Sequence, residues 1–198
     1  MRLIGENLSL ERGSRTLFRG LNFALNPGSL TRLTGPNGSG KTSLLRMIAG
    51  LGQPLTGRIR LENAGKSLDL SENLHFIGHQ EAVKPSLTML ENLQFWQEFH
   101  GGEAIEAALA TFGLEKLASL PTAWASEGQR RRLALSRLAL VKRTLWLLDE
   151  PTVGLDTASM DKLEKLMLQH LAAGGIILAA THVSLPIISL ELPIRGPN

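Results

Sequence analysis

Several short stretches in the first third of the chain alternate apolar with polar residues. A period of two is typical of strands that bury only one face. The alternating apolar positions are Leu8, Leu10, Leu21, Phe23, Leu25, Ile59 and Leu61. We therefore predict an antiparallel β-lobe from Met1 to about Asn63, wrapped around a loop and a helix in its middle.

Two continuous apolar runs near the carboxyl end, Leu145–Leu148 and Ile176–Ala180, are typical of strands buried on both faces. Both are far too short to cross a bilayer. Leu74–Ile77 is a third, shorter candidate strand. Buried strands separated by helices indicate an α/β fold.

Apolar residues spaced by three and four positions predict helices between these strands. Thr88–Glu91 is a capping box that opens a helix carrying Leu93, Trp96 and Phe99, and a second helix ends at Gly113. We expect their aromatic side chains mainly in the core, with a docking face for a partner as the alternative. These helices are predicted to form an inserted helical lobe.

Residues 35–42 read Gly-Pro-Asn-Gly-Ser-Gly-Lys-Thr, the G-x-x-x-x-G-K-T pattern of a phosphate-binding loop. A strand-like run, Ser29–Leu33, precedes the loop, and a helical spacing of leucines follows it. Lys41 is predicted to lie against the β- and γ-phosphates, and the Thr42 hydroxyl is predicted to ligate Mg²⁺. The predicted nucleotide-binding residues here are Gly35, Pro36, Asn37, Gly38, Ser39, Gly40, Lys41, Thr42 and Ser43.

Polar residues follow each of the three buried-strand candidates. An acid at the carboxyl end of an apolar strand is the Mg²⁺-binding arrangement of phosphate-loop ATPases, so Asp149 is predicted to hold the metal, directly or through water. Glu150 is predicted to polarise the attacking water. His182 is expected to contact a γ-phosphate or to orient Glu150. Gln80 is expected to reach Mg²⁺ or the water through its amide oxygen, with an ordinary loop residue as the alternative.

The segment Ser126–Gln129 opens another predicted helix. A serine and a glycine at a helix start favour phosphate oxygens, so Ser126, Gly128 and Gln129 are candidate nucleotide contacts. The arginines at 130–132 have no interleaved aromatic residues. We interpret them as a solvated basic helix start with local ion pairs, and we predict no nucleic-acid partner.

Arg12 lies ahead of the phosphate loop in the β-lobe. A planar guanidinium at this point is able to stack on an adenine ring. An exposed arginine in a turn is an equally good interpretation of the residue type alone.

The bulk composition excludes several classes of protein. The chain has 198 residues, 43% apolar and 20% charged, with a net charge of +3, which is ordinary for a globular protein. It has no cysteine, so disulfides, thiolate metal sites and cysteine nucleophiles are excluded. The amino terminus lacks the apolar region of a signal peptide. A role at a membrane would therefore need another chain to supply the spanning part.

Taken in order, these motifs resemble those of the nucleotide-binding subunits of ABC transporters. The matching segments are Walker A at Gly35–Thr42, the Q-loop at Gln80, the signature at Ala125–Gln129, Walker B at Leu145–Asp149, the D-loop around Asp156 and the H-loop at His182. The signature departs from the family's Leu-Ser-Gly-Gly-Gln at Ala125 and Glu127. The family's adenine-stacking position is usually aromatic, whereas Arg12 stands there.

This resemblance implies the fold and the cofactors. It implies a single ABC ATPase domain over residues 1–198, with a RecA-like core and β-lobe at about 1–80 and 144–198. A helical lobe is implied at about 86–143. ATP and Mg²⁺ are the implied cofactors.

Within the family, the chain is most similar to the ATP-binding subunits of bacterial haem exporters of cytochrome c biogenesis. The similarity rests on short length and on local sequences such as Glu11–Gly13, Leu17–Leu21, Ile77–Gln80 and Trp124–Arg132. It implies integral haem-exporter membrane subunits as partners and a peripheral location on the cytoplasmic face of the bacterial inner membrane. It also implies ATP hydrolysis coupled to haem delivery or to release of a haem-loaded chaperone.

A single copy is predicted to be incomplete, because phosphoryl transfer needs positive charge on every side of the γ-phosphate. We expect a homodimer in which Lys41 of one copy and Ser126 with Gly128 of the other grip each ATP. A transporter of another small solute is one alternative. The others are soluble ABC ATPases of DNA repair, which carry a long coiled coil, and of translation, which carry two tandem domains.

Overall fold

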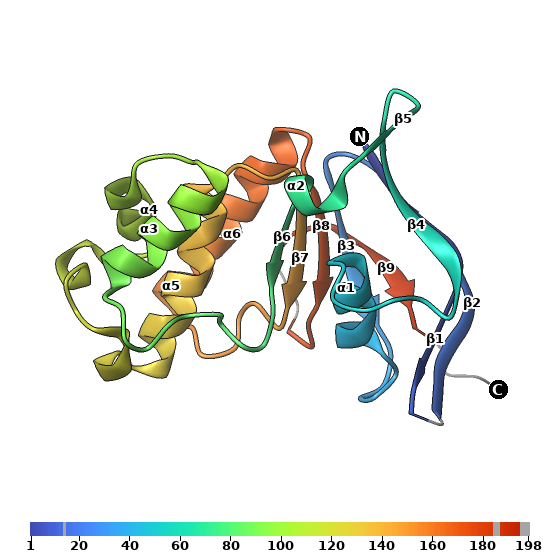
Figure 1. Cartoon of the computed structure of the whole chain (residues 1–198), viewed down its shortest axis with the longest axis horizontal. Coiled ribbons are helices and arrows are strands. Elements are labelled where there is room, and N and C mark those ends of the chain that lie inside the picture. Colours follow the sequence, from blue (N-terminus) through green and yellow to red (C-terminus); the bar gives the residue numbers. More distant parts are fainter. Residues whose placement is uncertain (14, 184–186, 195–198) are drawn as a thin grey trace. The chain divides into compact units, whose positions relative to one another are not determined.

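The structure is a computed structural model that describes residues 1–13, 15–183 and 187–194. Figure 1 shows its elements in chain order. The strands are β1 (Arg2–Arg12), β2 (Arg15–Leu25), β3 (Ser29–Thr34), β4 (Thr56–Asn63), β5 (Lys66–Leu68), β6 (Leu74–Ile77), β7 (Leu145–Asp149), β8 (Ile176–Ala180) and β9 (Ser189–Pro193). The α-helices are α1 (Lys41–Ile48), α2 (Leu70–Asn73), α3 (Met89–His100), α4 (Ile105–Thr111), α5 (Glu127–Leu140) and α6 (Thr157–Ala172), and short 3₁₀ turns lie at Glu115–Leu117 and Thr122–Trp124.

The chain divides into two compact units. Unit 1 comprises Met1–Phe76, Arg143–Glu150 and Leu168–Asn198, and unit 2 comprises Ile77–Lys142 and Pro151–Met167. The sequence places residues 151–167 in the core, whereas the structure groups them with the helices. Within unit 2, Gly128 and Gly154 approach closely, since a Cβ on Gly128 would lie 2.9 Å from the Gly154 carbonyl oxygen.

Unit 1 contains two sheets. One has the strand order β2-β1-β4-β5 and is antiparallel, as predicted for residues 1–63. The other has the order β6-β7-β8-β3-β9, with parallel pairing of β7 with β8, β8 with β3, and β3 with β9. β3 therefore belongs to the parallel sheet, although β1, β2 and β4, its neighbours in sequence, form the antiparallel sheet. Its partner β8 is buried at all five positions, and such two-sided burial is typical of parallel strands.

Helix α1 packs in unit 1 against the inner strands β7 and β8 (Figure 1). Leu44, Leu45, Met47 and Ile48 on this helix are at most 4% exposed. They join one core cluster with residues of both sheets, including Leu3, Leu8, Leu25, Leu33, Leu61, Leu147, Ile176 and Leu178. This core fixes the helix that follows the glycine-rich loop.

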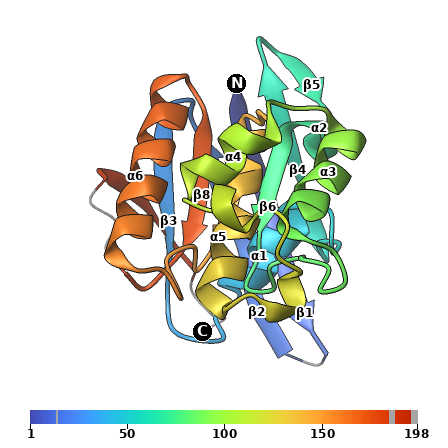
Figure 2. The ribbon, with the colours of Figure 1, turned by 90° about the vertical axis from the view of Figure 1, so that its left-hand side faces the viewer.

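Unit 2 is built on α3, α4 and α5, which contact one another (Figure 2). Leu93 and Phe112 are buried, but Phe99 is 75% exposed, so its assignment to the core is wrong. Phe99 follows Leu93 by six positions, which at about 100° per residue turns it to another face of α3. Trp96 is partly buried instead, with the Arg137 guanidinium 4.5 Å from its ring centroid.

No helix among the described residues combines the length and the hydropathy that crossing a membrane requires.

Candidate functional site

The loop between β3 and α1 can be built only with glycine at two of its positions. Gly35 has φ 140°, and a Cβ there would lie 2.5 Å from the carbonyl oxygen of Ile194. Gly40, the residue that precedes α1, has φ 106°, and a Cβ there would lie 3.2 Å from Leu17. These conformations are strained for any residue with a side chain. The glycine pattern of residues 35–42 is therefore a backbone requirement.

Lys41, the first residue of α1, lies largely buried against this loop with 9% of its surface exposed. Its Nζ donates hydrogen bonds to the carbonyl oxygens of Gly35 (2.7 Å) and Pro36 (3.1 Å). Since Gly40 has no side chain to cap the helix, backbone N–H groups of the first turn have no side-chain partner from that residue. An ammonium group and the positive end of a helix thus meet at one place, which favours a phosphate.

Thr42 and Asp149 come from α1 and β7 and meet directly. The Thr42 hydroxyl donates a hydrogen bond of 3.1 Å to Oδ1 of Asp149, which is 3% exposed. A hydroxyl beside a carboxylate supplies the oxygen ligands that Mg²⁺ prefers, and Mg²⁺ usually takes few protein ligands and keeps waters or substrate phosphates. Among the described residues no cluster of three or more His, Asp or Glu side chains is placed to hold a metal. The pair fits a Mg²⁺ that arrives with a phosphate.

Glu150 follows β7 in an unusual backbone conformation. Its φ of 47° is left-handed, which is uncommon for a residue other than glycine and concentrates at functional sites. A hydrogen bond from its backbone N–H to the Ala180 carbonyl oxygen (2.7 Å) holds this turn. The turn directs its side chain to His182, whose backbone N–H lies 3.4 Å from Oε2 and whose Nε2 lies 3.6 Å from Oε1. The predicted contact between His182 and Glu150 is therefore present.

These groups line one cavity of about 390 Å³ in unit 1. Its walls are Arg12, Leu17, Asn37, Gly38, Gly40, Lys41, Thr42, Ser43, Asp149, Glu150, Ala180 and His182. Three other predicted loop residues are not in its wall. Gly35 and Pro36 act through the carbonyl oxygens that bind Lys41, and the Ser39 side chain is buried with 5% exposure.

A second cavity of about 490 Å³ shares Arg12, Leu17, Thr42 and Ser43 with the first and adds the apolar residues Leu10, Met47 and Leu51. The sequence reasoning missed Leu17. Its position follows from the strand pairing, because Arg12 pairs with Arg15 at the end of the β1–β2 ladder, which places the start of β2 beside Arg12.

Ser126 in unit 2 is the N-cap of α5. Its Oγ accepts a hydrogen bond from the Gln129 N–H (3.2 Å), and the Gln129 Oε1 accepts one from the Ser126 N–H (2.8 Å). This capping box uses the side chain of Gln129 within the helix start. A Cβ on Gly128 would lie 2.9 Å from the Gly154 carbonyl oxygen, whereas Glu127 is exposed. The structure therefore accommodates the glutamate that replaces the first glycine of the signature, and it favours glycine at position 128.

Gln80 is exposed in the loop after β6, also in unit 2. The residues around it are tied to α5. Arg131 donates a hydrogen bond of 2.8 Å to the Gly78 carbonyl oxygen and is 4% exposed. The interpretation of residues 130–132 as a solvated helix start is therefore wrong for Arg131. Leu135 and Leu138, four and seven positions further on, share its face of α5 and are buried.

Comparisons with known proteins agree with this arrangement. Residues 18–153 match the ABC transporter family, which is more than half of the chain, and the chain belongs to that family. A curated relative from Bradyrhizobium diazoefficiens, named cytochrome c biogenesis ATP-binding export protein CcmA, is 50% identical over 99% of both chains.

Solved structures show the same fold. An ATP-binding protein of a putative ABC transporter from Pyrococcus furiosus superposes with a TM-score of 0.82 over 98% of both chains, at 23% identity. The cassette MJ0796, solved as a dimer in a post-hydrolysis state bound to ADP and Pi, superposes with a TM-score of 0.78 over 91% of this chain and 88% of that one, at 24% identity.

Proposed function

We propose that this chain is the ATP-hydrolysing subunit of a membrane exporter that serves c-type cytochrome biogenesis. Its turnover would drive haem export or delivery, or release of a haem-loaded chaperone. The observation that supports this most is the cavity of about 390 Å³ in unit 1, where Lys41, the Thr42–Asp149 pair and Glu150 converge. The name of the near-full-length relative favours this exporter over a transporter of another solute.

Binding of the triphosphate is proposed to begin at Lys41. Its ammonium exchanges the carbonyl oxygens of Gly35 and Pro36 for phosphate oxygens, and the N–H groups at the start of α1 add hydrogen bonds. A phosphate–ammonium contact at about 4 Å contributes roughly 4 kcal/mol at an effective dielectric of 20, before desolvation. That energy is large enough to bias a conformational change with a gap of a few kcal/mol.

Thr42 and Asp149 are the residues that would hold Mg²⁺, and Gln80 is proposed as a further ligand or as a contact of the attacking water. When bound, Mg²⁺ neutralises the charge that develops on the phosphate oxygens. The Thr42 hydroxyl currently donates to Asp149, so its oxygen lone pairs remain available to a cation.

Glu150 is proposed to accept the proton of the attacking water through its carboxylate. His182 orients that carboxylate through its backbone N–H and its ring, or contacts the γ-phosphate. The left-handed backbone at Glu150 keeps the carboxylate turned out of the strand and toward the cavity, so the geometry needed for proton transfer is built in before substrate binds.

The adenine ring is proposed to enter the second cavity. Leu10, Leu17 and Met47 offer it apolar surface, and the Arg12 guanidinium is able to stack on it as an aromatic ring does. This replaces the aromatic residue that is usual in the family.

Ser126 and Gly128 in unit 2 are proposed to bind the γ-phosphate of an ATP held by a second copy. A head-to-tail homodimer results, with two ATP molecules at its interface, and the dimeric cassette bound to ADP and Pi is a precedent for the assembly. The dimer is proposed to bind integral haem-exporter subunits from the cytoplasmic face of the bacterial inner membrane.

The proposal is tested by purifying the chain together with candidate haem-exporter membrane subunits and reconstituting the complex in liposomes. ATP hydrolysis and haem transfer are measured for the unsubstituted complex and for Glu150→Gln. We expect both activities in the first and neither in the second. Hydrolysis that responds to a different solute, or a chain that binds no integral membrane protein, would contradict the assignment.

A further inference from the structure

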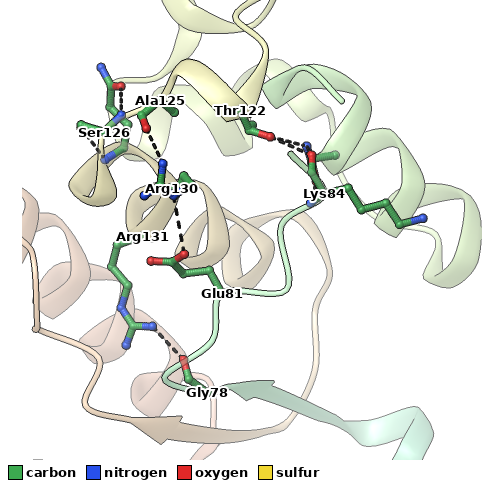
Figure 3. A network of polar contacts seen from close by, with 10 residues as sticks. Gly78, Glu81, Lys84, Thr122, Ala125, Ser126, Arg130 and Arg131 are labelled. Carbon is green, nitrogen blue, oxygen red and sulfur yellow. Dashed lines mark hydrogen bonds and ion pairs between the residues drawn. The ribbon is translucent and has the colours of Figure 1, made fainter. Parts of the chain in front are cut away.

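Two residues that flank Gln80 are attached to the first turns of α5, Gly78 by Arg131 and Glu81 by Arg130 (Figure 3). On one side the Arg131 guanidinium donates to the Gly78 carbonyl oxygen at 2.8 Å. On the other side Arg130 forms an ion pair with Glu81 at 4.0 Å and also donates to the carbonyl oxygen of Ala125, the residue before Ser126. Two successive arginines of α5 therefore connect the Gln80 loop to the start of that helix.

The two contacts differ in strength. Arg131 is 4% exposed and Gly78 is buried, and a charged hydrogen bond is strong where water is excluded. The side chains of Arg130 and Glu81 are 33% and 22% exposed, and their separation is at the limit of an ion pair, so this contact is weak. Arg131 is the main attachment.

The rest of the loop is also anchored within unit 2. The Thr122 hydroxyl lies within hydrogen-bonding distance of the carbonyl oxygens of Lys84 (2.7 Å) and Leu87 (3.0 Å). Ala82 has a left-handed φ of 52°, a conformation that persists only where the surroundings impose it. Gln80 is thus an exposed residue in a loop whose backbone is fixed on either side.

We propose that Arg131, supported by Arg130, is a positioning residue that makes the Gln80 loop and the Ser126–Gly128 helix start one rigid body. This inference rests on the proposed roles of Gln80 and Ser126. In the homodimer these two segments contact different ATP molecules, Gln80 the ATP of its own copy and Ser126 the ATP of the partner. A rigid connection between them couples hydrolysis at the two sites.

Pulsed electron spin resonance on the full chain measures the distribution of distances between the Gln80 loop and the start of α5. The chain has no native cysteine to compete for the label. Spin labels are attached to His79→Cys and Glu127→Cys, both exposed positions. Arg131→Met is expected to give about a twofold broader distance distribution than the unsubstituted chain, because the loop loses its buried anchor. Arg131→Lys, which keeps one donor, should restore a narrow distribution. Arg132→Met removes the neighbouring charge, which acts on Asp156, and serves as the matched control.

ATP hydrolysis supplies the functional readout. Arg131→Met is expected to lower kcat roughly tenfold and to reduce the Hill coefficient for ATP, since misplaced groups lose rate more than affinity. The Kd for ATP should stay within about twofold, because the phosphate loop belongs to unit 1. Glu81→Gln, which removes only the weak ion pair, should lower kcat by no more than about twofold.

The outcomes distinguish a failure of the positioning role of Arg131 from a failure of the proposed function. A narrow distance distribution in Arg131→Met, or an unchanged kcat and Hill coefficient, overturns the positioning role. A loss of folded protein with normal kcat per folded molecule assigns Arg131 to stability alone and also overturns it. An unsubstituted chain without ATP hydrolysis contradicts the proposed function instead, while the distance measurement still tests the connection.

Discussion

The two units present their candidate site residues in opposite ways. In unit 1 polar groups from different strands and helices contact one another, as Thr42 and Asp149 show, and Lys41 and Asp149 are buried. In unit 2 Ser126 and Gln129 bond to each other within one helix start, and Gln80 is exposed. Unit 1 therefore holds a cavity in which a phosphate can bind. The candidate groups of unit 2 lie at the surface instead, where a nucleotide held by another copy could reach them. This difference supports an ATP site shared between two copies.

The largest effect is expected from Lys41→Ala, which removes the buried ammonium from the cavity of unit 1. ATP affinity and hydrolysis should fall by at least about 100-fold, because a charged contact worth several kcal/mol is lost. Lys66→Ala, at an exposed position of the same unit, is the matched control and should bind ATP normally. Isothermal titration with ATP measures the change, and undiminished affinity would remove Lys41 from the site.

Glu150→Gln separates binding from chemistry inside unit 1. We expect kcat to fall by about 10²–10⁴-fold, the range for loss of a general base, while ATP affinity is retained. Steady-state phosphate release and titration with ATP measure the two quantities. Near-normal turnover would show that another group accepts the proton of the water.

Gly128→Ala tests the role of the surface groups at the start of α5 in unit 2. A Cβ there would lie 2.9 Å from the Gly154 carbonyl oxygen, so the start of α5 has to shift. We expect roughly a tenfold loss of hydrolysis with little change in ATP affinity, because only the groups offered to the partner move. Glu106→Ala, at an exposed position of α4 in the same unit, is the control. If affinity and hydrolysis fell together, unit 2 would contribute to binding in the single copy.

Much of unit 1 was predictable because its motifs constrain the backbone itself. Glycines that tolerate no Cβ and an acid at the end of a fully buried strand define the phosphate loop and Asp149 from spacing alone. The left-handed turn at Glu150 was not predictable, since nothing in the residue type signals it. In unit 2 the sequence identified the capping box of α3 and the helix start at Ser126–Gln129, but not the burial of Arg131 or the exposure of Phe99. The burial of Arg131 and the exposure of Phe99 depend on how each helix is rotated about its axis against its neighbours.

The smallest expected effect concerns the packing of β7, the strand whose last residue, Asp149, lines the cavity in unit 1. The His170 ring stacks on Trp146 of β7 with centroids 3.9 Å apart, and burial lowers the pKa of His170 below its ordinary 6.5. The unfolded chain then binds a proton more readily than the folded one. The free energy of unfolding should therefore decrease as the pH falls below about 6.5 toward the lowered folded pKa.

Thermal unfolding between pH 7.5 and 5.5 measures this. His170→Gln should reduce the dependence of Tm on pH, whereas His79→Gln, at an exposed position, should leave it as in the unsubstituted chain. An identical pH dependence in the His170 variant would exclude the buried ring as its source.

The shared site is tested most directly by crosslinking, which the absence of cysteine makes free of background. One preparation carries Asn37→Cys in the phosphate loop, another carries Glu127→Cys beside Ser126, and both carry Glu150→Gln so that ATP persists. The two are mixed and treated with a short bifunctional maleimide. We predict a covalent dimer that contains one copy of each variant and that forms only with Mg²⁺ and ATP. A mixture that stays monomeric with saturating ATP, or that crosslinks equally without it, would contradict the account.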